Sequence, residues 1–341
     1  MTQVSDFYYE LPEELIAQEP LRDRSASRML VVSRQRQTFH DDLFINFPRY
    51  LKPGDCLVLN NTRVFPARLH GSRNSEAGAQ IEVFLVRSLT PDETEWKVLV
   101  RPAKRVHLGD RILFSSDLQG EVLCEGEFGE RTIRLVSSQS IAELLERLGQ
   151  TPLPPYIHRT PDSTDRERYQ TVFAQHRGSV AAPTAGLHFT PEILDACRAA
   201  GAQIAYLTLH VGLGTFAALR ETKLGDIKLH AEYFEIAESE AAIMRAAKRL
   251  FCVGTTSVRT LETALLRGGL HGMNGETNLF IHPGFRFRAA GAMLTNFHLP
   301  QSSLLMLVSA FAGRDLIFRA YRRAVAERYR FFSYGDCMLI E

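Results

Sequence analysis

The segment Thr151-Pro-Leu-Pro-Pro-Tyr-Ile-His-Arg-Thr-Pro161 divides the chain into two parts with different sequence patterns. Its clustered prolines stiffen and extend the backbone, which is typical of a connector between domains. Before this segment, short β-rich runs follow one another closely, and after it helical patterns alternate with apolar strands. We therefore expect two structural units that adjoin at residues 151–161.

The part before the connector has the pattern of an antiparallel barrel or sandwich. Ile81, Val83 and Leu85 occupy alternate positions, as on one face of a strand, and Gly109-Asp110 is typical of a turn. The runs are not separated by helical patterns, and a helical pattern follows only at 140–149. The expected strands cover residues 55–59, 64–70, 79–87, 95–101, 110–115, 119–124 and 131–136.

The part after the connector predicts an α/β layer. Thr190-Pro191 is typical of a helix N-cap followed by a first-turn proline, and Gly201 closes that helix. Because the first fifty residues also mix strand and helix patterns (29–33 and 42–51), we predict an α/β base domain with an inserted antiparallel β-barrel domain. The expected boundaries are 1–54 and 151–341 for the base domain and 55–150 for the barrel domain. Further expected elements are strands 203–209, 232–236, 250–254 and 278–282, and helices 238–249, 257–267, 302–312 and 314–328.

The composition excludes several classes of protein. With 45% hydrophobic and 23% charged residues, the chain is expected to be a soluble globular protein. Forty Lys and Arg against 39 Asp and Glu give a net charge of +1, so any polyanion must meet a local basic patch. The apolar stretch 304–312 is too short to span a bilayer, and the five cysteines form no Cys-x-x-Cys pair. We expect a cytoplasmic monomer with reduced thiols and no membrane contact.

The segment Val253-Gly-Thr-Thr-Ser-Val-Arg259 is a candidate anion site. A strand ends there, the glycine permits a tight turn, and three hydroxyl groups lie where a helix begins. Free backbone N–H groups at such a turn bind a carboxylate or a phosphate, and the arginine is within reach. The alternative is ordinary N-capping by Thr or Ser.

The run Gly212-Leu-Gly-Thr-Phe-Ala217 fits the dinucleotide-binding pattern Gly-x-Gly-x-x-Gly/Ala. We reject a Rossmann motif, because residues 218–228 lack the sustained apolar stripe of the helix that the motif requires. The glycines still let backbone N–H groups approach a ligand. The alternative is a turn whose glycines are purely structural.

Three histidines lie among apolar neighbours at expected strand or helix ends: His188, His210 and His298. A single histidine of this kind is usually a hydrogen-bonded core residue. Three of them on loops form a candidate acid/base set. Since no His-x-x-x-His spacing occurs, we expect no metal site.

Two basic clusters stand out against the neutral average, and each has a solvated surface as its alternative interpretation. Cations at the rim of a barrel can follow a phosphate backbone, so the first cluster is a candidate surface for tRNA. The first cluster comprises Arg63, Arg68, Arg101, Lys104 and Arg105. The second, on the last expected helix, comprises Arg319, Arg322, Arg323, Arg328 and Arg330.

A set of segments spread over nearly the whole chain carries a family resemblance. The segments are Leu59–Val64 with Pro66–Arg68, Arg101–Arg105, Pro152–Tyr156, Gly178–Phe189, Leu209–Phe216, Val253–Arg259, Leu294–Pro300 and Tyr329–Asp336. In this order they resemble the S-adenosylmethionine:tRNA ribosyltransferase-isomerase family of the queuosine pathway. The resemblance implies a mixed α/β base domain with a β-barrel domain, as the residue patterns also predict.

The resemblance also implies a reaction. The ribosyl part of S-adenosylmethionine moves onto the aminomethyl group of a 7-deazaguanine at the wobble position of tRNA. The products are epoxyqueuosine in tRNA, adenine and methionine. S-adenosylmethionine is then a consumed substrate, no cofactor is expected, and the expected partner is tRNA that carries 7-aminomethyl-7-deazaguanine.

Such chemistry needs a base, an acid for adenine and exclusion of water, because the sulfonium acidifies the neighbouring ribose 5′ carbon. As a hypothesis we assign proton transfer to His188 and His298, with Glu232 and His210 in reserve. This assignment rests on chemical type and on placement in loops.

The substrate is expected to lie on the small-residue loops. The turn 254–259 would hold the methionine carboxylate, and Phe189 and Phe216 would pack against adenine. The expected substrate-binding residues are Thr184, Gly186, Phe189, Gly212, Gly214, Thr215, Phe216, Gly254, Thr255, Thr256, Ser257 and Arg259.

The chain departs from the family pattern at two places. His282 lies where the family usually has Tyr, and Lys228-Leu229 precedes His230 where Met is common. No phenol hydroxyl role is therefore carried over to position 282. Two other functions remain open at this point: a non-catalytic tRNA-binding protein, and a nicotinamide-dependent oxidoreductase that rests on the 212–217 glycines alone.

Overall fold

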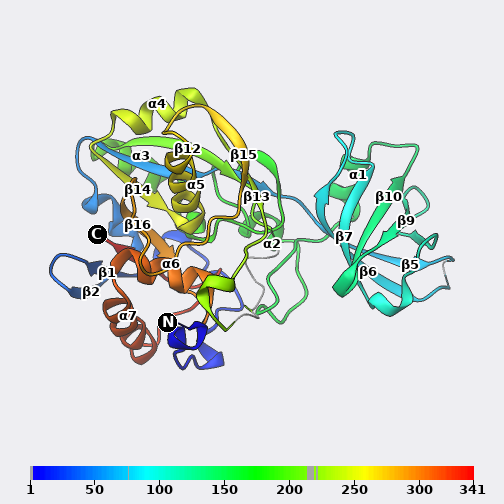
Figure 1. The fold of residues 1–341 in the computed structure, drawn as a ribbon, viewed down its shortest axis with the longest axis horizontal. Helices are drawn as coiled ribbons and strands as arrows, with labels where there is room; N and C mark the ends of the chain where they lie inside the picture. The colour runs from blue at the N-terminus through cyan, green and yellow to red at the C-terminus, as the bar shows by residue number, and fades with distance from the viewer. Residues whose placement is uncertain (1–2, 76, 213–218, 220–221) are drawn as a thin grey trace.

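The computed structural model describes residues 3–75, 77–212, 219 and 222–341, which form two lobes (Figure 1). The larger lobe contains a nine-stranded sheet with helices and both chain termini, and the smaller lobe is a closed six-stranded barrel. The predicted fold class, an α/β part with an inserted antiparallel β-barrel, is confirmed. The exact domain boundaries stay a prediction. No helix within the described ranges is both long and apolar enough to cross a membrane.

The large sheet combines segments that are far apart in the sequence. In spatial order its strands are β15 (Met273–Thr277), β13 (Glu232–Ile236), β12 (Gln203–Leu209), β3 (Asp55–Asn60), β14 (Arg249–Val253), β16 (Ala290–Asn296), β17 (Cys337–Ile340), β1 (Arg28–Ser33) and β2 (Thr38–Leu43). The central strands β12, β3, β14 and β16 run parallel to one another. Every residue of β3 is buried, as expected for a strand covered on both faces.

Helices cover both faces of this sheet. On one face lie α4 (Glu238–Ala246), α5 (Gly254–Leu266), α6 (Ser303–Ala312) and α7 (Arg314–Ala326), and on the other lies α3 (Pro191–Ala199). Alternate residues of β3 enter the two layers: Val58 packs with the α5 side and Leu59 with the α3 side. Thr190 caps α3 as predicted, since its Oγ1 accepts a hydrogen bond from the N–H of Ile193 at 3.3 Å.

The barrel has a core of its own. Its strands, in spatial order, are β10 (Glu130–Val136), β7 (Glu95–Arg101), β6 (Gln80–Ser88), β5 (Arg68–Arg73), β8 (Arg111–Leu113) and β9 (Gln119–Glu125). The pairings between these strands are antiparallel. Helix α1 (Ile141–Leu148) follows the last strand, and its Leu144 and Leu145 join the barrel core.

Some expected elements differ from the structure. The run 55–59, expected in the barrel, is β3 of the large sheet, because its partners β12 and β14 lie beyond the connector. The run 64–70 is split at Pro66: β4 (Thr62–Val64) pairs with β11 (His176–Ser179), and β5 starts at Arg68. The expected strand 278–282 is wrong, since β15 ends at Thr277 and the apolar side chains that follow pack on the core without strand pairing.

The proline-rich connector is tied to the larger lobe by a buried carboxylate. Asp165, in the short helix α2 (Asp165–Arg168), accepts hydrogen bonds from both terminal nitrogens of Arg159 at 2.6 and 2.7 Å and from the hydroxyl of Tyr334 at 2.8 Å. Burial works to raise the pKa of Asp165, but Arg159, the backbone N–H of Asp162 and Tyr334 outweigh it and hold the pKa below its ordinary value. The connector is thereby fixed to the segment before β17.

Replacing Asp165 with Asn is expected to lower the free energy of unfolding at pH 7 by about 3 kcal/mol, because Arg159 loses its buried partner. The pKa of Asp165 is lower in the folded protein than in the unfolded chain, where it is about 4. The ionised carboxylate therefore stabilises the fold above about pH 4, and this stabilisation is lost as the pH falls through the folded-state pKa. The difference in free energy of unfolding between wild type and Asp165→Asn, measured by urea denaturation, should therefore be smaller at pH 3 than at pH 7. Asp162→Asn, at an exposed neighbouring carboxylate, serves as the control and should cost less than about 1 kcal/mol. Equal midpoints for the two variants at pH 7 would contradict this role of Asp165.

Candidate active site

A pocket lies at the carboxyl ends of the neighbouring parallel strands β14 and β16, where open α/β sheets commonly bind ligands. Its free space is about 680 Å³ when the gaps between its side chains and the open solvent at its mouth are included. None of the described residues that line it is Asp, Glu, Lys or Arg. The lining residues are Tyr156, Ala182, Pro183, Thr184, Ala185, Val211, Gly254, Thr255, Thr256, Thr295, Asn296, Phe297, His298, Leu299, Ser302, Leu304, Phe332 and Ser333.

The start of α5 forms one wall of the pocket. β14 ends at Val253, and the helix begins at Gly254, three residues before the predicted start. Gly254 has φ +84°, a conformation that an L-residue adopts only at a cost, so glycine is required for this tight turn. Val253 supplies no side-chain cap, and Thr256 Oγ1 is buried without a partner among the described residues. The N-terminal end of α5 therefore offers its N–H groups and partial positive charge to an anion in the pocket.

His298 is the histidine that lines the pocket. Its Nε2 lies 2.9 Å from Thr295 Oγ1, while its backbone N–H donates to the hydroxyl of Tyr321 at 3.0 Å. Nδ1 of His298 makes no hydrogen bond with any residue that the structure describes. Burial lowers its pKa to about 3, so the imidazole is neutral at physiological pH.

His188 lies behind the pocket wall. It is 4% exposed, and its ring nitrogens lie 2.9 Å from Ser27 Oγ and 3.2 Å from Asn296 Nδ2. Burial, with the positive charges of Arg24 and Arg330, lowers the pKa of His188 to about 3. Both ring nitrogens of His188 have hydrogen-bond partners, and His188 does not line the pocket. Asn296 therefore lies between His188 and a ligand in the pocket.

The expected residues Gly186 and Phe189 do not line the pocket. Phe189 is fully buried and packs edge-on against Phe44 and Phe47 at centroid distances of 5.0 and 5.5 Å. The expected contact of Phe189 with adenine is corrected to core packing. Gly186 faces Thr171 and Phe173, whereas Thr184 of the same loop does line the pocket.

Glu232 and Arg259 form a buried ion pair with each other. Their side chains are 6% and 7% exposed, and Glu232 Oε1 also accepts a hydrogen bond from the N–H of Gly212 at 2.9 Å. Arg259 lies on the second turn of α5, donates through Nε to the carbonyl of Leu279, and does not line the pocket. The pair holds β13, α5 and the start of the glycine-rich run together.

The remaining loop candidates lie apart from the pocket or outside the described residues. His210 Nδ1 lies 2.8 Å from Thr62 Oγ1, and burial, then His176, lowers the pKa of His210 to about 4. Ser257 Oγ donates to the carbonyl of Val253 within α5. The expected residues Gly214, Thr215 and Phe216 lie outside the described residues.

The five cations of the first basic cluster differ in their surroundings. Arg68 lies where the barrel joins the larger lobe, since its backbone pairs with Gln150, and Arg63 precedes it on β4. Arg101 ends β7, and the other end of this strand adjoins β11 through the ion pair of Glu93 with Arg177. Arg101 is nevertheless close to Arg68, because Arg101 lies opposite Glu82 in the sheet and the Glu82 carboxylate is 3.8 Å from Arg68 Nε. Lys104 and Arg105 follow there in a short 3-10 turn.

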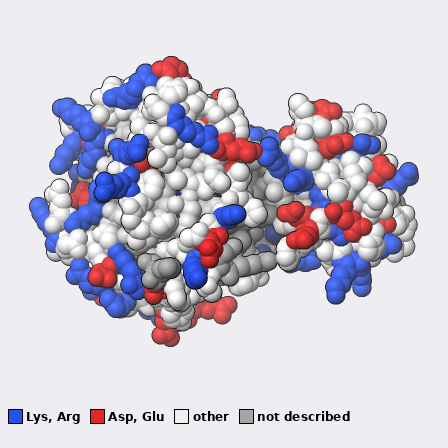
Figure 2. Space-filling model, in the orientation of Figure 1, with Lys and Arg blue, Asp and Glu red and all other residues white. Residues whose placement is uncertain are grey.

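Three of these cations are available to a ligand. Arg101, Lys104 and Arg105 are exposed and make no ion pair with any described residue. Nearby, Arg73 pairs with Asp110 at 3.4 Å. Figure 2 shows both signs of charge on the barrel lobe, so any anion contact there is local.

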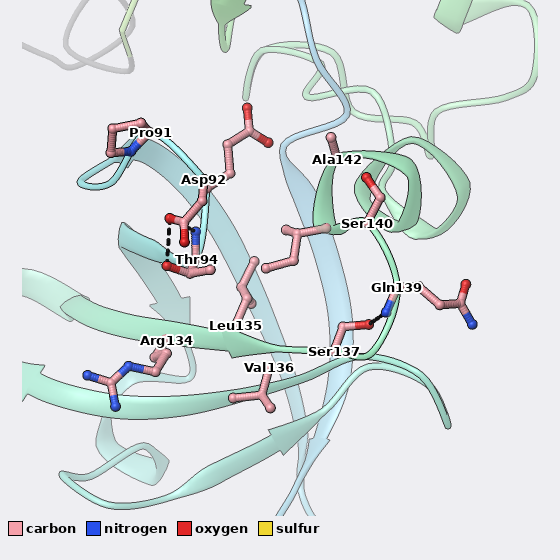
Figure 3. Close-up of a pocket in the computed structure, with 12 residues that line it drawn as sticks. Pro91, Asp92, Thr94, Arg134, Leu135, Val136, Ser137, Gln139, Ser140 and Ala142 are labelled. Carbon is pink, nitrogen blue, oxygen red and sulfur yellow. Dashed lines mark hydrogen bonds between the residues drawn. The ribbon is translucent and has the colours of Figure 1, made fainter.

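Figure 3 shows a second depression, between the turn at Pro91–Thr94, the end of β10 and the start of α1. It is an open groove, and its polar groups largely bond to one another: Thr94 Oγ1 donates to Asp92 at 2.8 Å, and the N–H of Gln139 donates to Ser137 Oγ at 2.9 Å. The cation in its lining, Arg134, is paired with Glu95 on a neighbouring strand. No expected site residue lines this groove, so the pocket at β14 and β16 is the candidate active site.

Several polar and aromatic residues of the pocket were not among the predicted site residues. Tyr156 and Phe332 bring their ring centroids to 4.7 Å, and Tyr156 OH lies 2.7 Å from Ser333 Oγ. Asn296 is the other omission. These residues all lie in segments that carry the family resemblance, and that was the available signal. Within the described residues, no group of three or more His, Cys, Asp or Glu side chains is arranged to hold a metal ion.

Comparisons with known proteins agree over the full chain. Residues 4–340 match the family model described as queuosine biosynthesis protein. The chain is 54% identical over 353 residues to an S-adenosylmethionine:tRNA ribosyltransferase-isomerase of Solibacter usitatus (strain Ellin6076), with 99% of each covered. It is 48% identical over 342 residues to a relative of the same name in Caldanaerobacter subterraneus subsp. tengcongensis, with 98% of this chain and 99% of the relative covered. A crystal structure of S-adenosylmethionine tRNA ribosyltransferase from Thermotoga maritima has TM-score 0.57 and 38% identity, covering 99% of this chain and 100% of that chain.

The fold, a sheet that carries a pocket and an attached barrel, is shared with these relatives. Together they define an enzyme of the transferase and isomerase class. The chain belongs to the queuosine biosynthesis protein family. The resemblance found in the sequence is thereby confirmed.

The buried ion pair gives a test of its structural role. Glu232→Gln and Arg259→Met should each lower the free energy of unfolding by about 3 kcal/mol, because each removes one member of a buried ion pair. The double variant should lose clearly less free energy of unfolding than the sum of the two single losses. Chemical denaturation of the four proteins measures this coupling, and strictly additive losses would show that the pair does not act as a unit.

Proposed function

We propose that this enzyme transfers and isomerises the ribosyl moiety of S-adenosylmethionine onto 7-aminomethyl-7-deazaguanine at the wobble position of tRNA. The products are epoxyqueuosine in tRNA, adenine and methionine. S-adenosylmethionine is a consumed substrate in this proposal, and no cofactor takes part. The observation that carries the proposal is the pocket between β14 and β16 in a chain that is 54% identical to a relative bearing the name of this activity.

The walls of the pocket suit the separate parts of S-adenosylmethionine. The uncapped start of α5, at Gly254–Thr256, matches the methionine carboxylate. The rings of Tyr156 and Phe332 suit a sulfonium or a purine, because aromatic faces attract cations and stack on bases. The described part of the lining has no charged side chains and is largely apolar, so electrostatic interactions within it are weakly screened.

His298 is our candidate for proton transfer. The sulfonium acidifies the ribose 5′ carbon, and a neutral imidazole that lines the pocket can take that proton. Loss of the proton lets adenine leave the sugar, with a proton supplied to the purine. The amine of the modified guanine then attacks the sugar, and closure of the epoxide expels methionine. His188, behind the wall, is in this proposal a positioning residue.

The barrel is proposed to contribute to tRNA docking. Arg101, Lys104 and Arg105 are exposed cations without ion-pair partners among the described residues, and such cations gain most by contacting phosphates. The connector that joins barrel and sheet carries Tyr156 into the pocket wall. A nucleic acid bound to the barrel would in this way be tethered to the chemical site.

The decisive experiment mixes the protein, S-adenosylmethionine and tRNA that carries 7-aminomethyl-7-deazaguanine, and follows free adenine by chromatography. We expect adenine in amounts equal to the modified tRNA, and none with unmodified tRNA. A protein that binds tRNA but never releases adenine would instead be the non-catalytic tRNA-binding alternative.

His298→Asn should slow adenine release at least about 100-fold, since general acid/base catalysis contributes that much or more. In the wild type, the low pKa of His298 keeps it neutral, so single-turnover adenine release should not fall between pH 7 and pH 5 through this group. An ordinary histidine of pKa 6.5 would lose about 30-fold over that range. His271→Asn, on an exposed turn, is the control. Near-normal release by His298→Asn would refute the assignment.

Replacing Arg101, Lys104 and Arg105 with Ala should weaken tRNA binding and reduce the slope of log affinity against log salt by about 2 to 3. Binding measured at several salt concentrations gives both quantities. A matched control removes three exposed cations of α7, Arg319, Arg322 and Arg323, and should leave the slope nearly unchanged. If the barrel variant and the control bind tRNA alike, this part of the barrel is not the docking surface.

A further inference from the structure

The amide of Asn296, at the end of β16, has an orientation that its surroundings fix. Its Nδ2 lies 3.1 Å from the carbonyl oxygen of Phe332 and 3.4 Å from that of Asp336. Carbonyl oxygens only accept hydrogen bonds, so the NH₂ group, and not the amide oxygen, is turned toward them. The side chain is 2% exposed.

His188 strengthens this orientation. Asn296 Nδ2 lies 3.2 Å from His188 Nε2, which must therefore accept, and the ring proton is then on Nδ1. From there it is donated to Ser27 Oγ at 2.9 Å, and Ser27 Oγ donates onward to the carbonyl of Arg24 at 3.3 Å. The chain of hydrogen bonds ends on the backbone, so the amide is held from behind by a neutral histidine.

The oxygen of the same amide is left without a partner. Asn296 Oδ1 is buried and accepts no hydrogen bond from any described residue, although a buried acceptor without a partner is costly. Asn296 lines the pocket together with its neighbours Thr295 and His298. Because Nδ2 is engaged by His188 and by backbone carbonyls, Oδ1 is the atom of this side chain whose hydrogen bond is left for a ligand to supply.

The surroundings select the kind of donor that fits this oxygen. Among the described residues, the pocket lining contains no carboxylate that would compensate a buried ammonium, and it contains the aromatic pair Tyr156 and Phe332. A neutral N–H on a flat ring is therefore the better match than a charged amine. The start of α5, at Gly254–Thr256, lines the same pocket and can bind the carboxylate of the same ligand.

We propose that Asn296 Oδ1 accepts a hydrogen bond from the exocyclic 6-amino group of the adenine of S-adenosylmethionine and so selects a 6-aminopurine over a 6-oxopurine. This inference rests on the proposed function. In a 6-oxopurine the amino donor is replaced by a carbonyl acceptor, and two acceptors then face each other in a buried site. Sites built around a buried hydrogen bond reject ligands that lack the partner far more strongly than apolar sites reject a size change.

The test compares S-adenosylmethionine with its 6-deaminated analogue, S-inosylmethionine, using the wild-type enzyme and modified tRNA. The rate of purine release per substrate concentration should be at least about 100-fold lower for the analogue. A second analogue, without the α-amino group of methionine, tests the other N–H donor. Its loss of rate should be the same in wild type and in Asn296 variants.

Variants assign the discrimination to this residue. Asn296→Leu and Asn296→Ser should reduce the ratio of the two release rates, adenine to hypoxanthine, to less than about 10-fold. They should do so by slowing the reaction of S-adenosylmethionine and not that of the analogue. Thr256→Val, at the start of α5, should slow release of both purines equally and keep the wild-type ratio. A ratio between substrates is insensitive to a general loss of folded enzyme, so it separates recognition from stability. Should either Asn296 variant fail to fold, the other variant and the wild-type comparison still decide.

Three outcomes would overturn the proposal. The first is release of hypoxanthine by the wild type within about 3-fold of adenine, and the second is a wild-type ratio that persists in the Asn296 variants. The third is that the Asn296 substitutions change the rate of purine release only for the analogue without the α-amino group. In each case adenine would still be released from S-adenosylmethionine, so the proposed function would stand. Absence of any adenine release would instead be the failure of the proposed function itself.

Discussion

The parallel pairing of β3 with β12 on one side and with β14 on the other is the constraint on which the rest of the structure depends. β3 precedes the barrel in sequence, whereas both partners follow the connector, so the sheet closes only when the chain has returned from the barrel. Because β3 is buried on both faces, it also separates the two apolar layers of the larger lobe. Its neighbour β14 and the next strand, β16, then end side by side and form the floor of the pocket.

Local patterns in the sequence predicted most elements of the fold, and long-range pairing accounts for the errors. The alternation in β6 and β7 and the cap at Thr190 are local signals, and the structure contains them. The apolar run at 55–59 looked like its barrel neighbours, since a short strand carries no mark of the sheet it joins. The strand β17, at 337–340, was missed because its partners β1 and β16 are remote in sequence.

The site was less predictable than the fold. Residue type and loop placement found His298 and the turn at Gly254, both of which line the pocket. The same reasoning grouped His188 with His298, although the two differ only in what their ring nitrogens contact. The ion pair of Glu232 with Arg259 was not predicted either, because opposite charges far apart in the sequence carry no local sign that they are in contact. Three-dimensional hydrogen bonding therefore decides which of the chemically suitable groups face a ligand.

The two backbone hydrogen bonds between Arg68 and Gln150 close the path of the chain where it leaves and re-enters the larger lobe. From the standpoint of polymer physics, the whole barrel is consequently one long loop with pinned ends. Closing a loop costs entropy that grows only slowly with its length, so a folded module of this size adds little to the cost of assembling the sheet. Such an arrangement allows the module to be lengthened, exchanged or remodelled in evolution while the parent fold keeps its strand order.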